Sequence, residues 1–227
     1  LFYLFLFKIL SKKIRLISEI QMDPEEAYIY LVNLLEKTNS LMGSLIVRDI
    51  NLESESKNKY KNIHKTSSDL SRNNSEDSNN NSEVDINILI QEKEDELYFS
   101  PEKGNVIFAS AIDCWGFTLE SFSDLLSKST GFKREVITKL LWGEYYFNKS
   151  TKKVHKTKIN SNSKPMFVEF VLNNIYKLYN LALFEKNVEA VIKASKTVGA
   201  ELLKNEVNMF EKNPRAVLRV FKIIYFN

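Results

Sequence analysis

The chain has 227 residues, of which 44% are hydrophobic, and its 32 Lys and Arg residues nearly balance its 29 Asp and Glu residues. The formal net charge of +3 excludes a strongly basic nucleic-acid module of the histone or protamine kind, although it leaves room for a local basic face. One cysteine and two histidines argue against a disulfide framework and a conventional zinc centre, and no glycine-rich phosphate-binding motif is present.

The first ten residues are apolar or aromatic except for Lys8. A membrane-spanning helix needs about 20 apolar residues. In a signal peptide the basic residues would precede the apolar run, whereas here Lys12, Lys13 and Arg15 follow it. We therefore favour a buried central strand of a parallel sheet over a membrane segment, and we expect no membrane partner.

A helix is predicted to begin at Asp23, which can cap it, with Pro24 in the first turn and Glu26 three residues after the cap. The residues that then recur at helical spacing form a packing face: Ala27, Leu31, Leu34, Leu35, Thr38 and Met42. From residue 51 the composition changes, with eight Asn and eight Ser among residues 51–83. Such a segment buries too little apolar surface to offset its ordering entropy, so we predict a disordered insertion over residues 51–96.

Strands and helices are predicted to alternate after the insertion, which indicates the α/β or α+β class. Residues 97–99 and 106–109 are predicted to form two strands joined by a tight turn. Two helices follow, one capped by Thr118 and one from about Lys133 to Gly143, and the inward residues of the second are Val136, Ile137, Leu140 and Leu141. The remaining predicted elements are a hairpin of residues 145–147 and 153–155, a long helix after Pro165, and helices over 188–198 and from Pro214 onward.

A strip of lysines surrounds His155 in the predicted hairpin: Lys152, Lys153, Lys156 and Lys158. Such a strip can contact a phosphate backbone. It can equally protect an exposed strand edge from unwanted pairing. The sequence leaves both interpretations open.

The strand over 106–109 leads into Ser110-Ala111-Ile112. A serine at the end of such a strand is typical of the last guanine-contacting loop of a GTPase. In that loop the backbone N–H after the serine donates to guanine O6, a contact that adenine cannot make. We find no nucleophile, paired-carboxylate or metal-ligand pattern, and so predict no catalytic residue and no metal ligand in this chain.

Residues 99–113 with Trp115-Gly116-Phe117 resemble the elongation factor-like GTPases of cytoplasmic ribosome biogenesis, which are relatives of eukaryotic elongation factor two. Three further blocks, residues 15–28, 141–147 and 164–179, appear in that family's order. The run Ser110 to Asp113 stands where the elongation factor typically has Ser-Gly-Leu-His. This difference and the long insertion favour the biogenesis GTPase, with the translocation GTPase as the alternative.

The resemblance implies an α/β fold made of the C-terminal part of a P-loop GTPase G domain and a small inserted α/β subdomain. Residues 1–50 would be a G-domain fragment, 51–96 the disordered insertion, 97–117 the last G-domain strand and guanine loop, and 118–227 the insert. The residues implied to contact guanine are Lys12, Ser110, Ala111 and Ile112.

The resemblance also implies a cytoplasmic GTPase that acts on the large ribosomal subunit with the Shwachman–Bodian–Diamond protein, where GTP hydrolysis releases an anti-association factor. The parent protein would bind GTP with Mg²⁺. Because the chain has no phosphate-binding loop, we do not expect it to bind GTP tightly by itself, and whether it is an enzyme alone stays open. A non-catalytic ribosome-docking module is the second interpretation.

The guanine-specificity motif of the family, Asn-Lys-x-Asp, falls on residues 11–14, where only Lys12 matches. Ile14 cannot accept the two hydrogen bonds that the motif's aspartate takes from guanine, and such a loss removes orders of magnitude in discrimination. Either guanine reading is lost or the first residues come from a misjudged exon boundary. We favour the second explanation.

Overall fold

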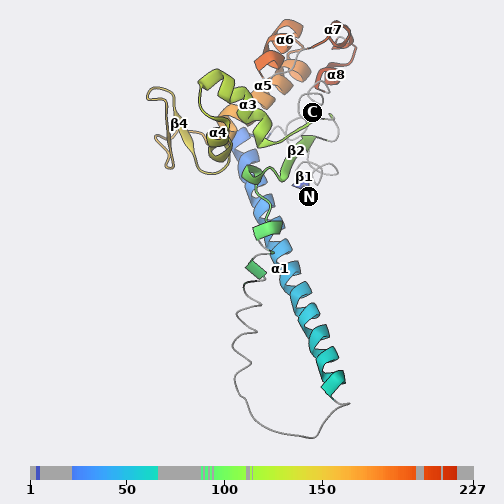
Figure 1. Cartoon of the computed structure of the whole chain (residues 1–227). Coiled ribbons are helices and arrows are strands. Elements are labelled where there is room, and N and C mark those ends of the chain that lie inside the picture. Colours follow the sequence, from blue (N-terminus) through green and yellow to red (C-terminus); the bar gives the residue numbers. More distant parts are fainter. Residues whose placement is uncertain are drawn as a thin grey trace. The chain divides into compact units, whose positions relative to one another are not determined.

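The computed structural model describes residues 4–5, 22–65, 88, 90–91, 93, 95–110, 113, 115–197, 202–210 and 212–218. It divides into two compact units (Figure 1). The first unit is formed by Leu1–Leu34 and Phe99–Asn227, and the second unit by Leu35–Tyr98. The described parts contain helices and two small sheets, which agrees with the predicted mixture of helices and strands.

Helix α1 spans Pro24–Lys65, and the boundary between the two units falls within it. It begins as predicted, because Asp23 Oδ1 accepts the Glu25 N–H at 2.8 Å and caps the first turn. Its length contradicts the prediction of disorder for residues 51–65. Extending an existing helix costs far less than starting one, and the Glu and Lys residues of this stretch are good helix formers. Helical positions also recur between residues 88 and 97, while residues 66–87 lie outside the described residues.

The first unit contains a three-stranded sheet of order β1-β2-β3. Its strands are β1 (Leu4–Phe5), β2 (Val106–Ser110) and β3 (Trp115–Phe117). β1 pairs parallel to β2, with Leu4 opposite Val106, so these two residues of the opening run form a parallel-paired strand as predicted. The predicted central place is wrong, because β1 lies at the edge of the described sheet, in which β2 and β3 pair antiparallel. The other residues of that run lie outside the described residues.

The predicted strand over residues 97–99 is wrong, because Leu97 is helical and a short 3₁₀ helix, η1 (Pro101–Lys103), precedes β2. Here nearby side chains form hydrogen bonds with backbone groups that would otherwise pair with a neighbouring strand. Asn105 Oδ1 accepts the Ser100 N–H at 2.8 Å. Such short-range bonds compete with strand pairing, and periodicity alone does not reveal them.

An aromatic cluster forms the centre of the first unit. Phe108 of β2 lies 5.0 Å from Phe167 and 5.4 Å from Phe117 of β3, measured between ring centroids. Trp142 lies 5.0 Å from Phe167, and Tyr28 of α1 lies 5.1 Å from Trp142. Aromatic pairs at these separations add to the free energy of apolar burial, so the cluster joins the sheet to the first turns of α1.

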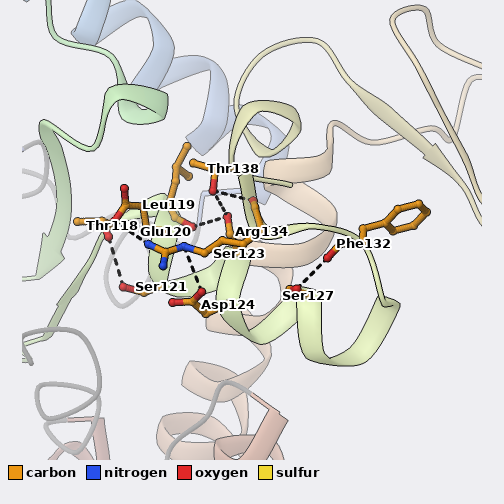
Figure 2. A network of polar contacts seen from close by, with 10 residues as sticks. All are labelled: Thr118, Leu119, Glu120, Ser121, Ser123, Asp124, Ser127, Phe132, Arg134 and Thr138. Carbon is orange, nitrogen blue, oxygen red and sulfur yellow. Dashed lines mark hydrogen bonds and ion pairs between the residues drawn. The ribbon is translucent and has the colours of Figure 1, made fainter. Parts of the chain in front are cut away.

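Helices α3 (Leu119–Thr130) and α4 (Arg134–Leu141) follow the sheet at the predicted places. Figure 2 shows the polar contacts that join them. Thr138 Oγ1 donates to Ser123 Oγ at 2.8 Å in a buried position. On the exposed side, Arg134 reaches Glu120 at 3.0 Å and Asp124 at 3.1 Å.

The predicted hairpin is confirmed as β4 (Tyr146–Asn148) and β5 (Lys153–His155), which pair antiparallel. Val136 of α4 was predicted to face inward, but its side chain is 45% exposed. Ile137 and Leu141 are buried as predicted.

The long helix after Pro165 is interrupted by two π-helical segments that the sequence did not predict. Its segments are η2 (Val168–Leu172), α5 (Asn173–Tyr179) and η3 (Asn180–Phe184). The Asn173 N–H bonds to the Val168 carbonyl, five residues back, as a π turn requires. The chain continues with α6 (Val188–Thr197), α7 (Lys204–Phe210) and α8 (Pro214–Leu218), and only α7 was not predicted. These helices gather around the end of the long helix (Figure 1).

Candidate functional site

The predicted guanine loop begins at the carboxyl end of β2. Ser110 is the last residue of β2, is half-buried, and pairs with Trp115 of β3. The other residues predicted to contact guanine, Lys12, Ala111 and Ile112, lie outside the described residues. Their contact with guanine therefore stays a prediction.

A chain of hydrogen bonds begins at Ser110 and passes through Asp113. Ser110 Oγ lies 3.1 Å from Asp113 Oδ2, to which it donates, and 3.4 Å from the Asp113 backbone N–H. The Tyr179 hydroxyl donates to the same Oδ2 at 2.6 Å. Trp115 Nε1 donates to the Tyr179 hydroxyl oxygen at 2.7 Å. We name these four residues the Ser110 cluster.

The Ser110 cluster is largely shielded from solvent. Asp113 is 5% exposed, Tyr179 3% and Trp115 6%. Burial, followed by the neighbouring Asp113, raises the pKa of Tyr179 above that of an ordinary phenol. Tyr179 therefore remains a protonated hydrogen-bond donor at neutral pH. Asp113 Oδ1, in contrast, is buried and has no hydrogen-bond partner among the described residues.

Sequence reasoning found Ser110 but missed Tyr179. It noted Asp113 only as a difference from elongation factor two, and it gave Tyr179 no role. The two residues are separated by 66 positions, and nothing local in a single sequence links them. The strand-end motif gives the position of Ser110, whereas the partner on α5 depends on tertiary packing.

The β4–β5 hairpin carries the lysine strip, and we call residues 149–158 the basic hairpin. Its strip lysines, Lys152, Lys153, Lys156 and Lys158, are all exposed, as is His155. No acidic residue occurs between positions 145 and 168. Lys149 is paired with Glu169 at 2.6 Å, whereas the strip lysines have no ion pair within the described part of the chain. This unbalanced charge suits a phosphate backbone, although edge protection would produce the same pattern.

A small apolar pocket of about 90 Å³ lies between α3, α4 and the hairpin. Its lining residues are Leu126, Phe132, Val136, Ile137, Leu140, Phe147, Val154, Met166 and Phe170. The partial exposure of Val136 is explained by its place at this pocket. The walls carry no charged side chain to orient a nucleotide, so the Ser110 cluster is the better candidate for the nucleotide site.

In the part of the chain that the structure describes, no group of three or more His, Cys, Asp or Glu side chains is placed to hold a metal ion. None of the described helices is both long and apolar enough to cross a membrane.

The chain is similar to longer proteins over most of its length, although no protein-family model matches it. It is 37% identical over 195 residues to elongation factor-like GTPase 1 of Mus musculus, which covers 86% of this chain. It is 34% identical over 213 residues to ribosome assembly protein 1 of Saccharomyces cerevisiae and 32% over 212 residues to that of Schizosaccharomyces pombe, covering 93% and 92% of this chain. The alignments span only 16%, 17% and 18% of these three relatives.

Proposed function

Because the chain is homologous over most of its length to a segment of elongation factor-like GTPases and ribosome assembly proteins, we propose that it forms part of a GTPase of ribosome assembly. The observation that carries the proposal is identity of 32–37% across 86–93% of the chain. In this proposal residues 1–50 and 97–117 contribute to the G domain, and residues 118–227 form its insert.

The proposed chemistry is recognition of the guanine base by the loop after Ser110. The backbone N–H that follows the serine donates to guanine O6, and Lys12 lies along the base. Other segments of the complete protein supply the phosphate and Mg²⁺ contacts, because this chain has no phosphate-binding loop motif. Hydrolysis then drives release of an anti-association factor from the large ribosomal subunit in the cytoplasm, together with the Shwachman–Bodian–Diamond protein.

Nucleotide binding tests the proposal directly. We expect the full-length gene product to bind labelled GTP in preference to ATP, and the isolated 227-residue chain to bind GTP only weakly. Fluorescence anisotropy with labelled GTP and ATP measures both. Submicromolar GTP binding by the isolated chain would contradict the proposal that other segments supply the phosphate contacts. A full-length product with no preference for GTP would contradict the proposed function.

Factor release tests the ribosomal part of the proposal. Large subunits loaded with the anti-association factor are incubated with the full-length gene product and either GTP or a non-hydrolysable analogue. We expect the factor to leave the sedimenting subunits only with GTP. Equal release with both nucleotides would show that hydrolysis does not drive this step.

A second candidate function, docking on ribosomal RNA, is favoured by the unbalanced charge of the basic hairpin. Each lysine that neutralises a phosphate adds about one to the slope of binding affinity against salt concentration on logarithmic axes. We therefore expect the triple variant Lys152→Glu, Lys153→Glu, Lys156→Glu to weaken binding to large subunits and to reduce that slope by about three.

The matched control reverses three exposed lysines on the helices of the same unit, Lys177, Lys193 and Lys196. This control changes net charge by the same amount at a different place. Equal effects of the two triple variants would indicate non-specific attraction, and no effect of the hairpin variant would leave edge protection as the role of its lysines.

A further inference from the structure

We propose that the second unit carries a docking groove for a basic amphipathic helix of a partner protein. The groove runs along residues 36–47 of α1 and is lined as well by Leu97 and Tyr98, and we call it the α1 groove. It shares no residue with the Ser110 cluster or with the basic hairpin. The inference therefore goes beyond the proposed function and does not depend on it.

The α1 groove has the dimensions of a helix-docking site. Its volume is about 770 Å³, and its lining positions on α1 include Glu36, Ser40, Gly43 and Val47, which recur at intervals of three or four residues. Such spacing places them on one face of the helix. From residue 36 to residue 47 the helix rises about 17 Å, which is three turns. An elongated groove walled by one helix and two further residues encloses little of a small molecule, and it fits a second helix better.

The floor of the α1 groove is largely apolar. Ile46 is buried there, while the side chains of Val47 and Tyr98 are 37% and 50% exposed. Ser44 Oγ donates to the Ser40 carbonyl at 3.0 Å, so this hydroxyl is already bonded within the helix. Exposed apolar surface beside a hydroxyl that is already bonded favours an apolar surface on the partner.

Gly43 lies in the middle of this face of α1. Glycine in a helix interior is destabilising relative to alanine, so the stability of α1 does not explain its presence. Without a Cβ, residue 43 lets a partner come close to the helix backbone, and the side chains of Ser40 and Ser44 beside it are also short. Together these positions leave room for a bulky apolar side chain of the partner, such as leucine.

The charged side chains of the second unit are mostly acidic where the structure describes them. Two bases form ion pairs, Arg48 with Asp49 at 3.7 Å and Lys93 with Glu53 at 4.0 Å. The other charged side chains in that description are one base, Lys37, and four acids, Glu36, Glu55, Asp95 and Glu96.

Three of these acids lie at the α1 groove or next to it. Glu36 lines the groove, and the exposed Asp95 and Glu96 directly precede its lining residue Leu97. The lysines near the end of α1 begin at Lys57, ten positions beyond the groove, which is about 15 Å along the helix and more than one Debye length at physiological salt. The groove therefore attracts lysine and arginine and repels a phosphate backbone, which favours a basic protein segment over a nucleic acid.

A model peptide tests the groove directly. The probe is a fluorescently labelled peptide of about 18 residues, long enough to form a helix, with Leu at helical intervals of three and four and Lys elsewhere. We expect the 227-residue chain to bind it in fluorescence anisotropy measurements, with an affinity that falls as salt is raised. Two control peptides should bind at least about tenfold more weakly. One has the same composition with its Leu residues spread around the helix, and the other has Glu in place of Lys.

A matched pair of charge variants locates the site. Glu36→Lys reverses a charge at the groove, and Glu55→Lys makes the same change at an exposed position of α1 that does not line it. We expect Glu36→Lys to weaken binding of the Lys/Leu peptide about fivefold, because an attraction becomes a repulsion, and Glu55→Lys to change it less than about twofold. Lysine is a good helix former, so far-ultraviolet circular dichroism should be unchanged in both variants.

A second pair tests the apolar floor independently of charge. Val47→Ser truncates an exposed apolar side chain that lines the groove, and Leu52→Ser truncates one on the same helix that does not. We expect Val47→Ser to weaken peptide binding about threefold, as the loss of partial apolar burial implies, and Leu52→Ser to leave it unchanged.

Four results would overturn the inference. They are no binding of the Lys/Leu peptide, equal binding of the peptide with spread Leu residues, equal weakening by Glu36→Lys and Glu55→Lys, and equal weakening by Val47→Ser and Leu52→Ser. Self-association of the chain in analytical ultracentrifugation that Val47→Ser abolishes would also overturn it, because a second copy would then occupy the groove. The preference for GTP over ATP tests the proposed function separately, and none of these results changes it.

Discussion

Tyr28 joins the first turns of α1 to the turn that follows α4 by two hydrogen bonds to one glycine. Its hydroxyl donates to the Gly143 carbonyl at 3.1 Å and accepts the Gly143 N–H at 3.0 Å. Gly143 has φ of 102°, and a Cβ there would lie 3.3 Å from the Tyr145 ring. Few residues other than glycine fit this position, so the bond pair depends on both the conformation and the small size of residue 143.

This residue pair predicts a loss of stability at alkaline pH. Burial raises the pKa of Tyr28 from 10.0 to about 12. The folded protein therefore holds this proton when the unfolded chain has lost it. The stabilisation is complete below pH 10 and is lost as the pH rises towards 12. We expect urea unfolding to show this decline, and Tyr28→Phe to remove part of it.

Tyr28→Phe should also lower the free energy of unfolding at pH 7 by about 1 kcal/mol, because it removes both bonds to Gly143. Tyr30→Phe, on the same helix, is the control. The other tyrosines with a raised pKa, Tyr146, Tyr176 and Tyr179, keep some alkaline decline in the variant. An unchanged pH profile in Tyr28→Phe would show that Tyr28 titrates alike in the folded and unfolded states.

At the scale of elements, the contact between α3 and α4 separates buried from exposed polar interactions. Thr138 is 8% exposed and Ser123 is fully buried, and the Ser123 hydroxyl donates a hydrogen bond to the Leu119 carbonyl at 2.9 Å. Arg134 makes its two ion pairs with a side chain that is 45% exposed. Solvent-exposed ion pairs contribute about 0–1 kcal/mol, less than their geometry suggests.

We therefore expect Thr138→Val to destabilise the protein more than Arg134→Gln, although Arg134 makes two ion pairs. Thr138→Val should cost about 1 kcal/mol, because the hydroxyl of Ser123 loses its donor in a place without water. Adding Ser123→Ala should cost less than the single variants predict together, since the remaining polar group is then removed. The urea unfolding midpoints of the wild type, Thr138→Val, Ser123→Ala, their double variant and Arg134→Gln measure these losses. A larger loss of stability in Arg134→Gln than in Thr138→Val would contradict the prediction.

Sequence reasoning worked best where one local signal sets an element. Asp23 starts α1, and the hairpin of β4 and β5 lies where two short segments around a turn predicted it. It failed where the composition of a segment was considered without the helix that precedes it. The Asn- and Ser-rich stretch is predicted to be disordered from residue 51, yet α1 continues to Lys65. Extending a helix that has already formed costs less free energy than starting one. Helix α7, which has only seven residues, was not predicted.

At the scale of the whole molecule, the buried apolar residues are distributed unevenly between the two units. Among the described residues of the second unit, only Leu35, Ile46 and Ile50 are buried hydrophobics. The aromatic cluster and the Ser110 cluster both lie in the first unit. We infer that the first unit holds most of the apolar burial that stabilises the described fold.

This distribution predicts that the first unit folds without the second. Replacing residues 36–97 with a flexible Gly/Ser linker should leave the main thermal unfolding transition within about 4 °C of that of the intact chain, a shift that corresponds to at most about 1 kcal/mol. Near-ultraviolet circular dichroism, which reports on the packed Trp115 and Trp142, should be retained. A loss of that signal would show that the second unit is required for the core.

The candidate site was only half accessible to sequence reasoning. Ser110 was placed correctly at the end of a strand, because the strand and the motif are contiguous. Tyr179 was not found, because its bond to Asp113 depends on how a distant helix packs. For Lys12, Ala111 and Ile112, which lie outside the described residues, the predicted role remains a prediction.

The two π-helical segments rotate the residues that follow them about the axis of the long helix. Each π turn accommodates one residue more than α geometry would, and one residue corresponds to a rotation of about 100°. Deleting a residue from η2 would restore α geometry and turn Phe167, which is fully buried, relative to Tyr179 on α5. Both side chains could not then keep their places. The segment η2 lies between these two residues, and it thus aims one face of the helix at the aromatic cluster and another at Asp113.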